Sequence, residues 1–209
     1  MSYFITGTDT GVGKTITAAA MVLATGSHYW KPIQSGVSEE ITDVARVRQL
    51  TNLSQQHFSP STYNLNASLS PNQAAELQNI NLDVSTCRLP KISQSIIVEG
   101  AGGVFVPLNK NIYIIDLIVQ LALPVVIVSR GTLGTINHTL LTIEALRHRG
   151  LVIKGIVFSG ELNPQNQSDI ERYGEVKILF HVPLFPLLTP EIFQLWVREK
   201  QQHIQQSLL

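Results

Sequence analysis

The sequence predicts an α/β protein whose mostly parallel sheet carries helices on both faces. Four short runs, at residues 3–6, 95–98, 125–129 and 155–158, are apolar along nearly their whole length. Such runs indicate strands that are buried on both sides, as they are in parallel sheets. The runs alternate with longer segments of helical character, and this alternation is typical of a sheet wrapped by helices.

The remaining elements follow in chain order. Weaker strands are predicted at 28–33 and 176–182, and helices at about 14–25, 39–51, 72–78, 112–122, 135–148 and 190–206. The segment 53–93 is rich in Ser, Asn, Gln and Pro, so we predict a polar excursion with short helices, an insertion of a kind that is often functional. A chain of 209 residues has the right size for one such domain, spanning 1–209.

Composition limits the classes of partner. Fifteen basic and fifteen acidic residues give a net charge of zero with no basic arm, so we expect no nucleic-acid partner. No apolar run approaches the roughly 20 residues that span a bilayer, so we expect no membrane partner. The single cysteine, Cys87, cannot form an internal disulfide, and Met1 leads almost directly into the first apolar run. We therefore expect a cytoplasmic protein.

The first apolar run is followed directly by the loop GTDTGVGKT, residues 7–15, and then by a predicted helix. Glycines in such a loop let backbone amides approach phosphate oxygens, the lysine reaches the β- and γ-phosphates, and the final threonine is a natural Mg²⁺ ligand. The first glycine stands one residue earlier than usual, with Thr8 in its place. The alternative is a Gly-rich turn that only caps the helix. The candidate nucleotide contacts are Gly11, Val12, Gly13, Lys14, Thr15 and Ile16.

In open α/β sheets ligands collect at the carboxyl ends of the strands, so the residues after each strand are candidates. After the second strand, Pro32 favours an extended Lys31, whose ammonium would face the same crevice as the phosphate loop, and Ser35 follows on a turn. A solvated surface lysine is the alternative. The next helix carries Glu39, Glu40 and Asp43, and the pattern alone does not choose among these acids.

The apolar run 95–98 ends in Glu99, followed by Gly100, Ala101 and Gly102. A buried strand with a terminal acid resembles the second Mg²⁺-binding motif of phosphate-loop enzymes, with Glu in place of the usual Asp. The glycines leave bare backbone for a close ligand approach. An acid at a surface turn is the alternative.

The run 125–129 leads to Gly134-Thr135, which opens a helix. Thr135 is a plausible N-cap, and the amides of Thr135, Ile136 and Asn137 are predicted to be free. This helix start is a second candidate anion site, for something other than the nucleotide. An ordinary capped helix explains the pattern equally well.

These segments together resemble the dethiobiotin synthetase family. The matching stretches are FITGTDTGVGKT, KPIQSG, VEGAGGVFVPL, LPVVIV and TLGTINHTLLTIEALRHRGL, which occur in order over nearly the whole chain. The early glycine is typical of that family, so the resemblance implies an intact variant of the phosphate loop and a P-loop NTPase-like fold. It also implies a ligase that joins 7,8-diaminopelargonate and CO₂ with ATP hydrolysis, giving dethiobiotin, ADP and phosphate through a carbamate and a carbamic-phosphoric anhydride.

The resemblance assigns roles to the candidates. Lys31 would hold the carbamate and Lys14 the transferring phosphate, and Ser35 would touch the diamine. The carbamate and the transferring phosphate are both anionic, so a lysine ammonium can stabilise each of them. The resemblance, and not the composition, selects Asp43 from its acidic neighbours. Mg²⁺ would be organised by Thr15, Asp43 and Glu99.

Two further implications concern the partner subunit and the base. By the resemblance, the helix start from Gly134 to Asn137 receives the substrate carboxylate across the interface of a homodimer. Ser159-Gly160 stands where members of the family carry an Asn that reads adenine, so we expect relaxed base selectivity. Backbone groups around Pro183 are the alternative reader of the base.

The main alternative function is that of a regulatory ATPase of the chromosome- or septum-positioning kind, which shares the fold. Such proteins usually carry a second lysine early in the phosphate loop, where this chain has Asp9. The C-terminal helix balances its basic residues with Glu191 and Glu199, so we expect it to pack on its own chain.

Overall fold

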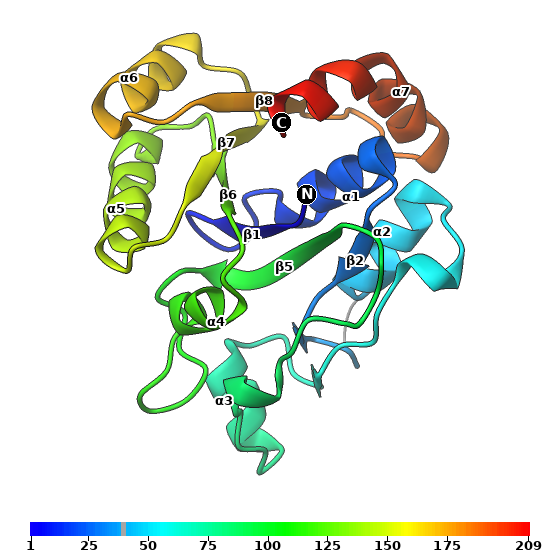
Figure 1. The fold of residues 1–209 in the computed structure, drawn as a ribbon, viewed down its shortest axis with the longest axis vertical. Helices are drawn as coiled ribbons and strands as arrows, with labels where there is room; N and C mark the ends of the chain where they lie inside the picture. Colours follow the sequence, from blue (N-terminus) through cyan, green and yellow to red (C-terminus); the bar gives the residue numbers. More distant parts are fainter. Residues whose placement is uncertain (39–40) are drawn as a thin grey trace.

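The computed structural model describes residues 1–38 and 41–209, and its centre is a six-stranded sheet in the order β2-β5-β1-β6-β7-β8 (Figure 1). Every neighbouring pair is parallel, which confirms the predicted class. The loops that follow β1, β5 and β6 therefore meet at one edge of the sheet. The strands are β1 (Tyr3–Gly7), β2 (His28–Trp30), β5 (Ile96–Gly103), β6 (Val125–Arg130), β7 (Ile153–Gly160) and β8 (Ile178–Pro183).

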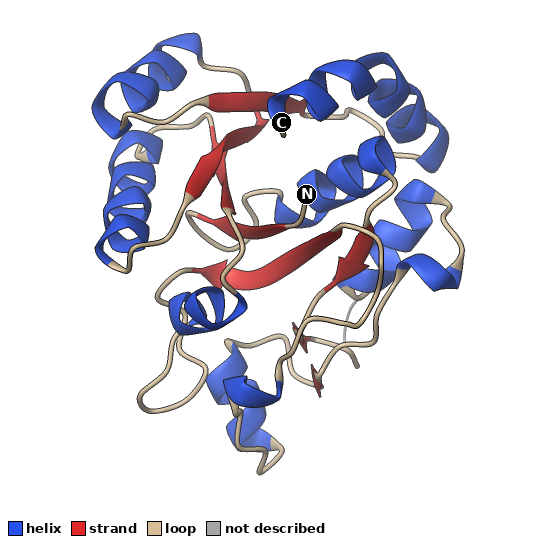
Figure 2. Cartoon of the chain, in the orientation of Figure 1, coloured by secondary structure: helices blue, strands red, loops and turns tan. Residues whose placement is uncertain are grey.

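Helices cover both faces of the sheet (Figure 2). One hydrophobic cluster joins the sheet to α1 (Lys14–Thr25), α2 (Asp43–Thr51) and α7 (Pro190–Ser207). A second cluster, on the opposite face, joins it to α4 (Ile114–Leu121), α5 (Thr135–His148) and α6 (Pro164–Gly174). In Figure 1, α3 (Pro71–Leu77) lies at one end of the molecule, where its buried Ala74 and Ala75 join the second cluster.

The helices that carry the site are fixed by simple side-chain chemistry. The middle of α1 is Ala18-Ala19-Ala20, fully buried, so the helix can lie close on the sheet. In α7, Phe193, Val197 and Ile204 recur at helical spacing and are buried against the same cluster as α1. The C-terminal helix thus packs on its own chain, as the sequence predicted. Within the described residues, no helix is long and apolar enough to cross a membrane.

Two strand predictions are corrected. The predicted strand 28–33 is two strands, β2 and β3 (Ile33–Ser35), because Pro32 lacks an N–H and cannot continue the ladder. β3 pairs instead with β4 (Tyr63–Leu65), which lies within the polar excursion. The prediction that a strand ends at Glu99 is also wrong, since β5 continues to Gly103.

The helix predictions are right in type, with one omission. The helix predicted at 39–51 begins at Asp43, behind its N-cap Thr42, and residues 39–40 lie outside the described part of the chain. The excursion contains the expected short helices, namely α3, η1 (Gln55–His57) and η2 (Val84–Thr86). α6 was not predicted, because its polar sequence buries only Ile170 and Gly174.

Candidate active site

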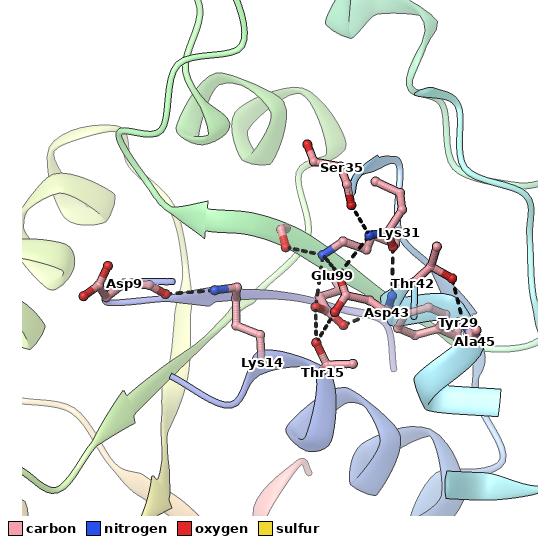
Figure 3. A network of polar contacts seen from close by, with 12 residues as sticks. Asp9, Lys14, Thr15, Tyr29, Lys31, Ser35, Thr42, Asp43, Ala45 and Glu99 are labelled. Carbon is pink, nitrogen blue, oxygen red and sulfur yellow. Dashed lines mark hydrogen bonds and ion pairs between the residues drawn. The ribbon is translucent and has the colours of Figure 1, made fainter. Parts of the chain in front are cut away.

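The phosphate loop lies between β1 and α1. Gly13 is the N-cap of α1 at φ 95°, a left-handed conformation that favours glycine. A Cβ at this position would also collide with the Ser159 hydroxyl, which lies against it from β7. The Lys14 ammonium donates to the backbone carbonyl of Asp9 at 2.8 Å, inside the curve of the loop (Figure 3). The lysine is therefore placed in the loop where phosphate would lie.

The charge on Lys14 is poorly stabilised by the protein alone. Its pKa is lowered to about 8, first by burial and second by the neighbouring charge of Lys31, against the opposing effect of Glu99 and Asp43. An anion beside this ammonium would favour the charged form. The environment of Lys14 is thus suited to a polyphosphate.

Two carboxylates, a hydroxyl and a second ammonium meet beside the loop (Figure 3). Thr15 Oγ1 lies 2.6 Å from Asp43 Oδ1 and 2.9 Å from Glu99 Oε1. Lys31 Nζ lies 2.9 Å from Asp43 Oδ2 and 3.1 Å from Glu99 Oε1, and it donates to the carbonyl of Gly100 at 3.0 Å. The structure therefore brings together residues from α1, α2, β5 and the end of β2.

The pairing favours the ionised forms of Lys31 and Asp43. Burial alone lowers the pKa of Lys31, but the charges of Glu99 and Asp43 outweigh it and the pKa is raised. Burial alone raises the pKa of Asp43, but Lys31 and the hydrogen bond from Thr15 outweigh it and the pKa is lowered. A buried charge of this kind is stable only when it is paired and hydrogen-bonded, and here each group supplies the partner of another.

The oxygen set fits a hard divalent cation. The described residues contain no group of three or more His, Cys, Asp or Glu side chains at metal-binding spacing. One oxygen of Asp43 and one of Glu99 nevertheless lie within 3 Å of the Thr15 hydroxyl. Magnesium prefers such oxygens and usually needs only one or two protein carboxylates, because water and phosphate complete its shell.

Sequence reasoning missed two side chains that hold these acids. Tyr29, in β2, donates its hydroxyl to Glu99 Oε2 at 2.8 Å and is fully buried. Burial raises the pKa of Tyr29 well above its usual value, so the phenol keeps its proton. Gln34, in β3, donates from its Nε2 to Asp43 Oδ2, and its Oε1 accepts from the backbone N–H of Asp43. Tyr29 carried no sequence signal, since a tyrosine beside apolar residues predicts core packing. Gln34 lies in the stretch KPIQSG, but that match assigned it no role.

A cleft of about 1010 Å³ lies at the carboxyl edge of the sheet, and the two lysines, the two carboxylates and Thr15 line it. The polar excursion forms part of its wall through residues 68–71. The Ser35 hydroxyl is buried there and has no hydrogen-bond partner within the described residues. The predicted site residues that line the cleft are Gly11, Gly13, Lys14, Thr15, Ile16, Lys31, Ser35, Asp43, Glu99, Ala101 and Gly102.

Other candidates lie near this cleft without lining it. Val12 is buried beneath the loop, and Gly100 is held in β5 against the Phe4 ring. Gly160 pairs with Pro183 where β7 and β8 end, next to Ser159. The base-reading role of these last three residues stays a prediction.

The predicted second anion site needs a correction. The N-cap of α5 is Gly134, at φ 91°, and not Thr135. The Thr135 amide donates to the carbonyl of Thr132 at 3.2 Å, and its hydroxyl is hydrogen-bonded to Ser129 Oγ at 2.7 Å, so neither group is free. Ile136 and Asn137 follow in the first turn of the helix, and their role stays a prediction.

Known structures with the same arrangement share only the fold. A ParA family ATPase from Chlorobium tepidum superposes with a TM-score of 0.53, covering 100% of this chain and 98% of that one. The cell division ATPase MinD from Pyrococcus furiosus gives 0.55, covering 99% and 95%. Both are 13% identical to this chain, so they confirm the P-loop NTPase-like fold and carry no functional weight.

Sequence relatives identify the family. The model of the AAA domain family AAA_26 matches residues 1–192. The biotin biosynthesis bifunctional protein BioCD of Bordetella avium is 42% identical over 94% of this chain, which spans only 42% of that longer protein. ATP-dependent dethiobiotin synthetase BioD of Agrobacterium fabrum is 41% identical over 91% of this chain and 90% of its own length. BioD of Novosphingobium aromaticivorans is 45% identical over 88% of both chains. The chain belongs to the ATP-dependent dethiobiotin synthetase family.

Proposed function

We propose that this protein forms dethiobiotin from 7,8-diaminopelargonate and CO₂, with ATP converted to ADP and phosphate. The observation that supports it most directly is the cluster of Lys14, Lys31, Thr15, Asp43 and Glu99 in one cleft. A regulatory ATPase would share the fold, but the relatives that cover most of this chain are named as synthetases.

The proposed reaction has three steps, and the two lysines accompany the negative charge through them. One amine of the substrate attacks CO₂ and loses a proton, giving a carbamate anion beside Lys31. A carbamate oxygen then takes the γ-phosphoryl group of ATP, and ADP departs. The second amine attacks the carbonyl carbon of this mixed anhydride, closing the ring as phosphate leaves. Fixed ammonium groups stabilise the charge that develops on such oxygens, and this is usually a large part of catalysis.

In this proposal Mg²⁺ is held by Thr15, Asp43 and Glu99. When bound, the cation neutralises phosphate charge and helps to orient the triphosphate. Glu99 is 1% exposed, and its second oxygen is engaged by Tyr29. This chain therefore presents a carboxylate whose direction is already fixed before the cation arrives.

The remaining assignments concern binding. The phosphate loop, together with the backbone of Gly100, Ala101 and Gly102, would surround the nucleotide, and its base would lie near Ser159, Gly160 and Pro183. Ser35 would contact the diamine, since its buried hydroxyl lacks a protein partner within the described residues. The helix start from Gly134 to Asn137 does not line this cleft in one chain. We therefore propose a homodimer, in which the same segment of a second copy completes the substrate site. We also propose that the enzyme acts in the cytoplasm.

The decisive test uses purified protein with diaminopelargonate, bicarbonate and MgATP and nothing else. We expect dethiobiotin, measured by mass spectrometry, in equal amount to the phosphate released. Omission of the diamine should reduce phosphate release to background. Phosphate release that ignores the diamine but requires DNA, lipid or another protein would instead support a regulatory ATPase.

A further inference from the structure

Gln34 is a polar side chain in β3 that is only 5% exposed, and its amide contacts three groups. Its Oε1 accepts from the backbone N–H of Asp43 at 3.1 Å. Its Nε2 donates to Asp43 Oδ2 at 3.3 Å and to the carbonyl of Ser35 at 2.8 Å. The amide thus grips both the main chain and the carboxylate of one residue.

This arrangement leaves Gln34 no donor for a ligand. A glutamine amide has two N–H donors and one acceptor oxygen. Both donors are engaged by Asp43 and Ser35, and the oxygen is engaged by the Asp43 amide. The side chain therefore acts on Asp43 and has no N–H left to donate to substrate or nucleotide.

The position of Asp43 explains why such a grip matters. Asp43 is the first residue of α2, where backbone amides have no partner within the helix. Thr42 satisfies the amide of Ala45 from inside the chain, whereas Gln34 satisfies that of Asp43 from the neighbouring strand. With Oδ2 held by Gln34 and Lys31, Oδ1 is the oxygen that faces Thr15.

We propose that Gln34 is a positioning residue that aims the Asp43 carboxylate at the divalent cation and so sets the affinity of the site for that cation. The proposal rests on the proposed function only in taking Asp43 as a cation ligand. Removing the amide takes away one of the three side chains that orient the Asp43 carboxylate and leaves the Asp43 backbone N–H without its partner. Loss of one hydrogen bond of ordinary net strength corresponds to about a fivefold to tenfold change in an equilibrium constant.

The test compares the parent protein with Gln34→Met, which keeps the volume but removes the amide, and with Gln34→Asn, which shortens the reach by one methylene. Free Mn²⁺ is measured by electron paramagnetic resonance in the presence of protein and ADP, without turnover. We expect Mn²⁺ to bind about fivefold more weakly or worse in both variants. The Mg²⁺ concentration for half-maximal activity should rise by the same factor, while kcat at saturating Mg²⁺ and KM for the diamine change less than about twofold.

Gln120 in α4 supplies the matched control, because its Nε2 likewise donates two hydrogen bonds, in this case to the backbone carbonyls of Val84 and Cys87 at 2.6 and 2.9 Å. Gln120→Met should leave Mn²⁺ binding unchanged. The proposal is overturned if Mn²⁺ binds both folded Gln34 variants as it binds the parent. It is also overturned if the loss lies only in KM for the diamine, or if neither variant folds. Failure of the parent to make dethiobiotin would refute the proposed function, but the Mn²⁺ measurements would still test whether Gln34 sets the affinity of the site for the cation.

Discussion

Lys31 is the residue whose replacement tests the proposed chemistry most sharply. Its ammonium is 4% exposed and lies 2.9 Å from Asp43 and 3.1 Å from Glu99, so Lys31→Gln removes a buried charge while keeping most of the side-chain length. If this charge stabilises the carbamate and its phosphorylation, about 3 kcal/mol of transition-state stabilisation should be lost, or roughly a hundredfold in kcat. ADP affinity should change less than about threefold, because Lys14 and the loop amides supply the phosphate contacts.

The same substitution should alter stability in a way that depends on the cation. Without Lys31, Asp43 and Glu99 lose the ammonium that pairs with both of them and keep only the nearby charge of Lys14, and breaking a buried pair typically costs about 3–5 kcal/mol. Because the Asp43 side chain is 31% exposed, water should reduce that penalty to the lower end or below. Mg²⁺ shares the two acids with Lys31 and should therefore raise the Tm of the variant more than that of the parent.

The assay combines single-turnover kinetics, ADP titration and thermal melting with and without Mg²⁺. Lys110→Gln is the control, because it removes one exposed lysine charge outside the cleft lining. A Lys31→Gln protein with near-normal kcat would refute the assigned role. A variant whose ADP affinity collapses together with kcat would show that Lys31 serves nucleotide binding instead.

Three further outcomes are expected. Thr15→Val, Asp43→Asn and Glu99→Gln should each raise the Mg²⁺ concentration for half-maximal activity, since each removes an oxygen ligand or its charge, and unchanged Mg²⁺ titrations in all three would contradict the cation site. The parent protein should prefer ATP over CTP and GTP, measured as kcat/KM, by a smaller factor than the Ser159→Asn variant does, because a well-aligned amide contributes about 1–3 kcal/mol of base discrimination. A kcat/KM preference for ATP above about a thousandfold in the parent would exclude relaxed selectivity. Phe193→Ala should lower the free energy of unfolding in urea by about 3–5 kcal/mol, because this fully buried ring packs on Phe185 and Trp196, and a loss below about 1 kcal/mol would show that α7 is dispensable to the core.

The elements that sequence reasoning located best are those whose environment is uniform. Residues 3–6 and 125–129 are apolar and buried on both faces, so their composition alone indicates a central strand. α6 has no such uniformity, since most of its residues are polar and exposed. The end of β5 was misjudged for a different reason. β5 continues past Glu99 because it still pairs with β1 at Gly103, opposite Gly7, and residue 100 is a glycine because the Phe4 ring lies where a Cβ would be. Such contacts between distant segments are not visible in local sequence.

Within the site, too, residues in local motifs could be predicted, and residues placed by contacts between distant segments could not. The phosphate loop is a local motif, so Lys14 and Thr15 could be predicted from the order of strand, loop and helix. Thr135 was predicted as the N-cap because threonine is a common capping residue, yet the loop enters α5 at φ 91° and selects Gly134. Tyr29 meets Glu99 across 70 positions of sequence, and nothing near either residue indicates that contact.

The tertiary contacts that sequence reasoning missed are also needed to stabilise the buried carboxylate of the cluster. Glu99 is 1% exposed, and an ionised carboxylate so placed would cost several kcal/mol if it stood alone. One of its oxygens meets Lys31 and Thr15, and the other meets Tyr29, so its lone pairs are satisfied in two directions. In the proposed cation site, a bound cation would replace the Lys31 contact at Glu99, while the Tyr29 contact would still hold the other carboxylate oxygen. Rigid support on one side and an exchangeable partner on the other is what a carboxylate needs in order to accept and release a cation in each catalytic cycle.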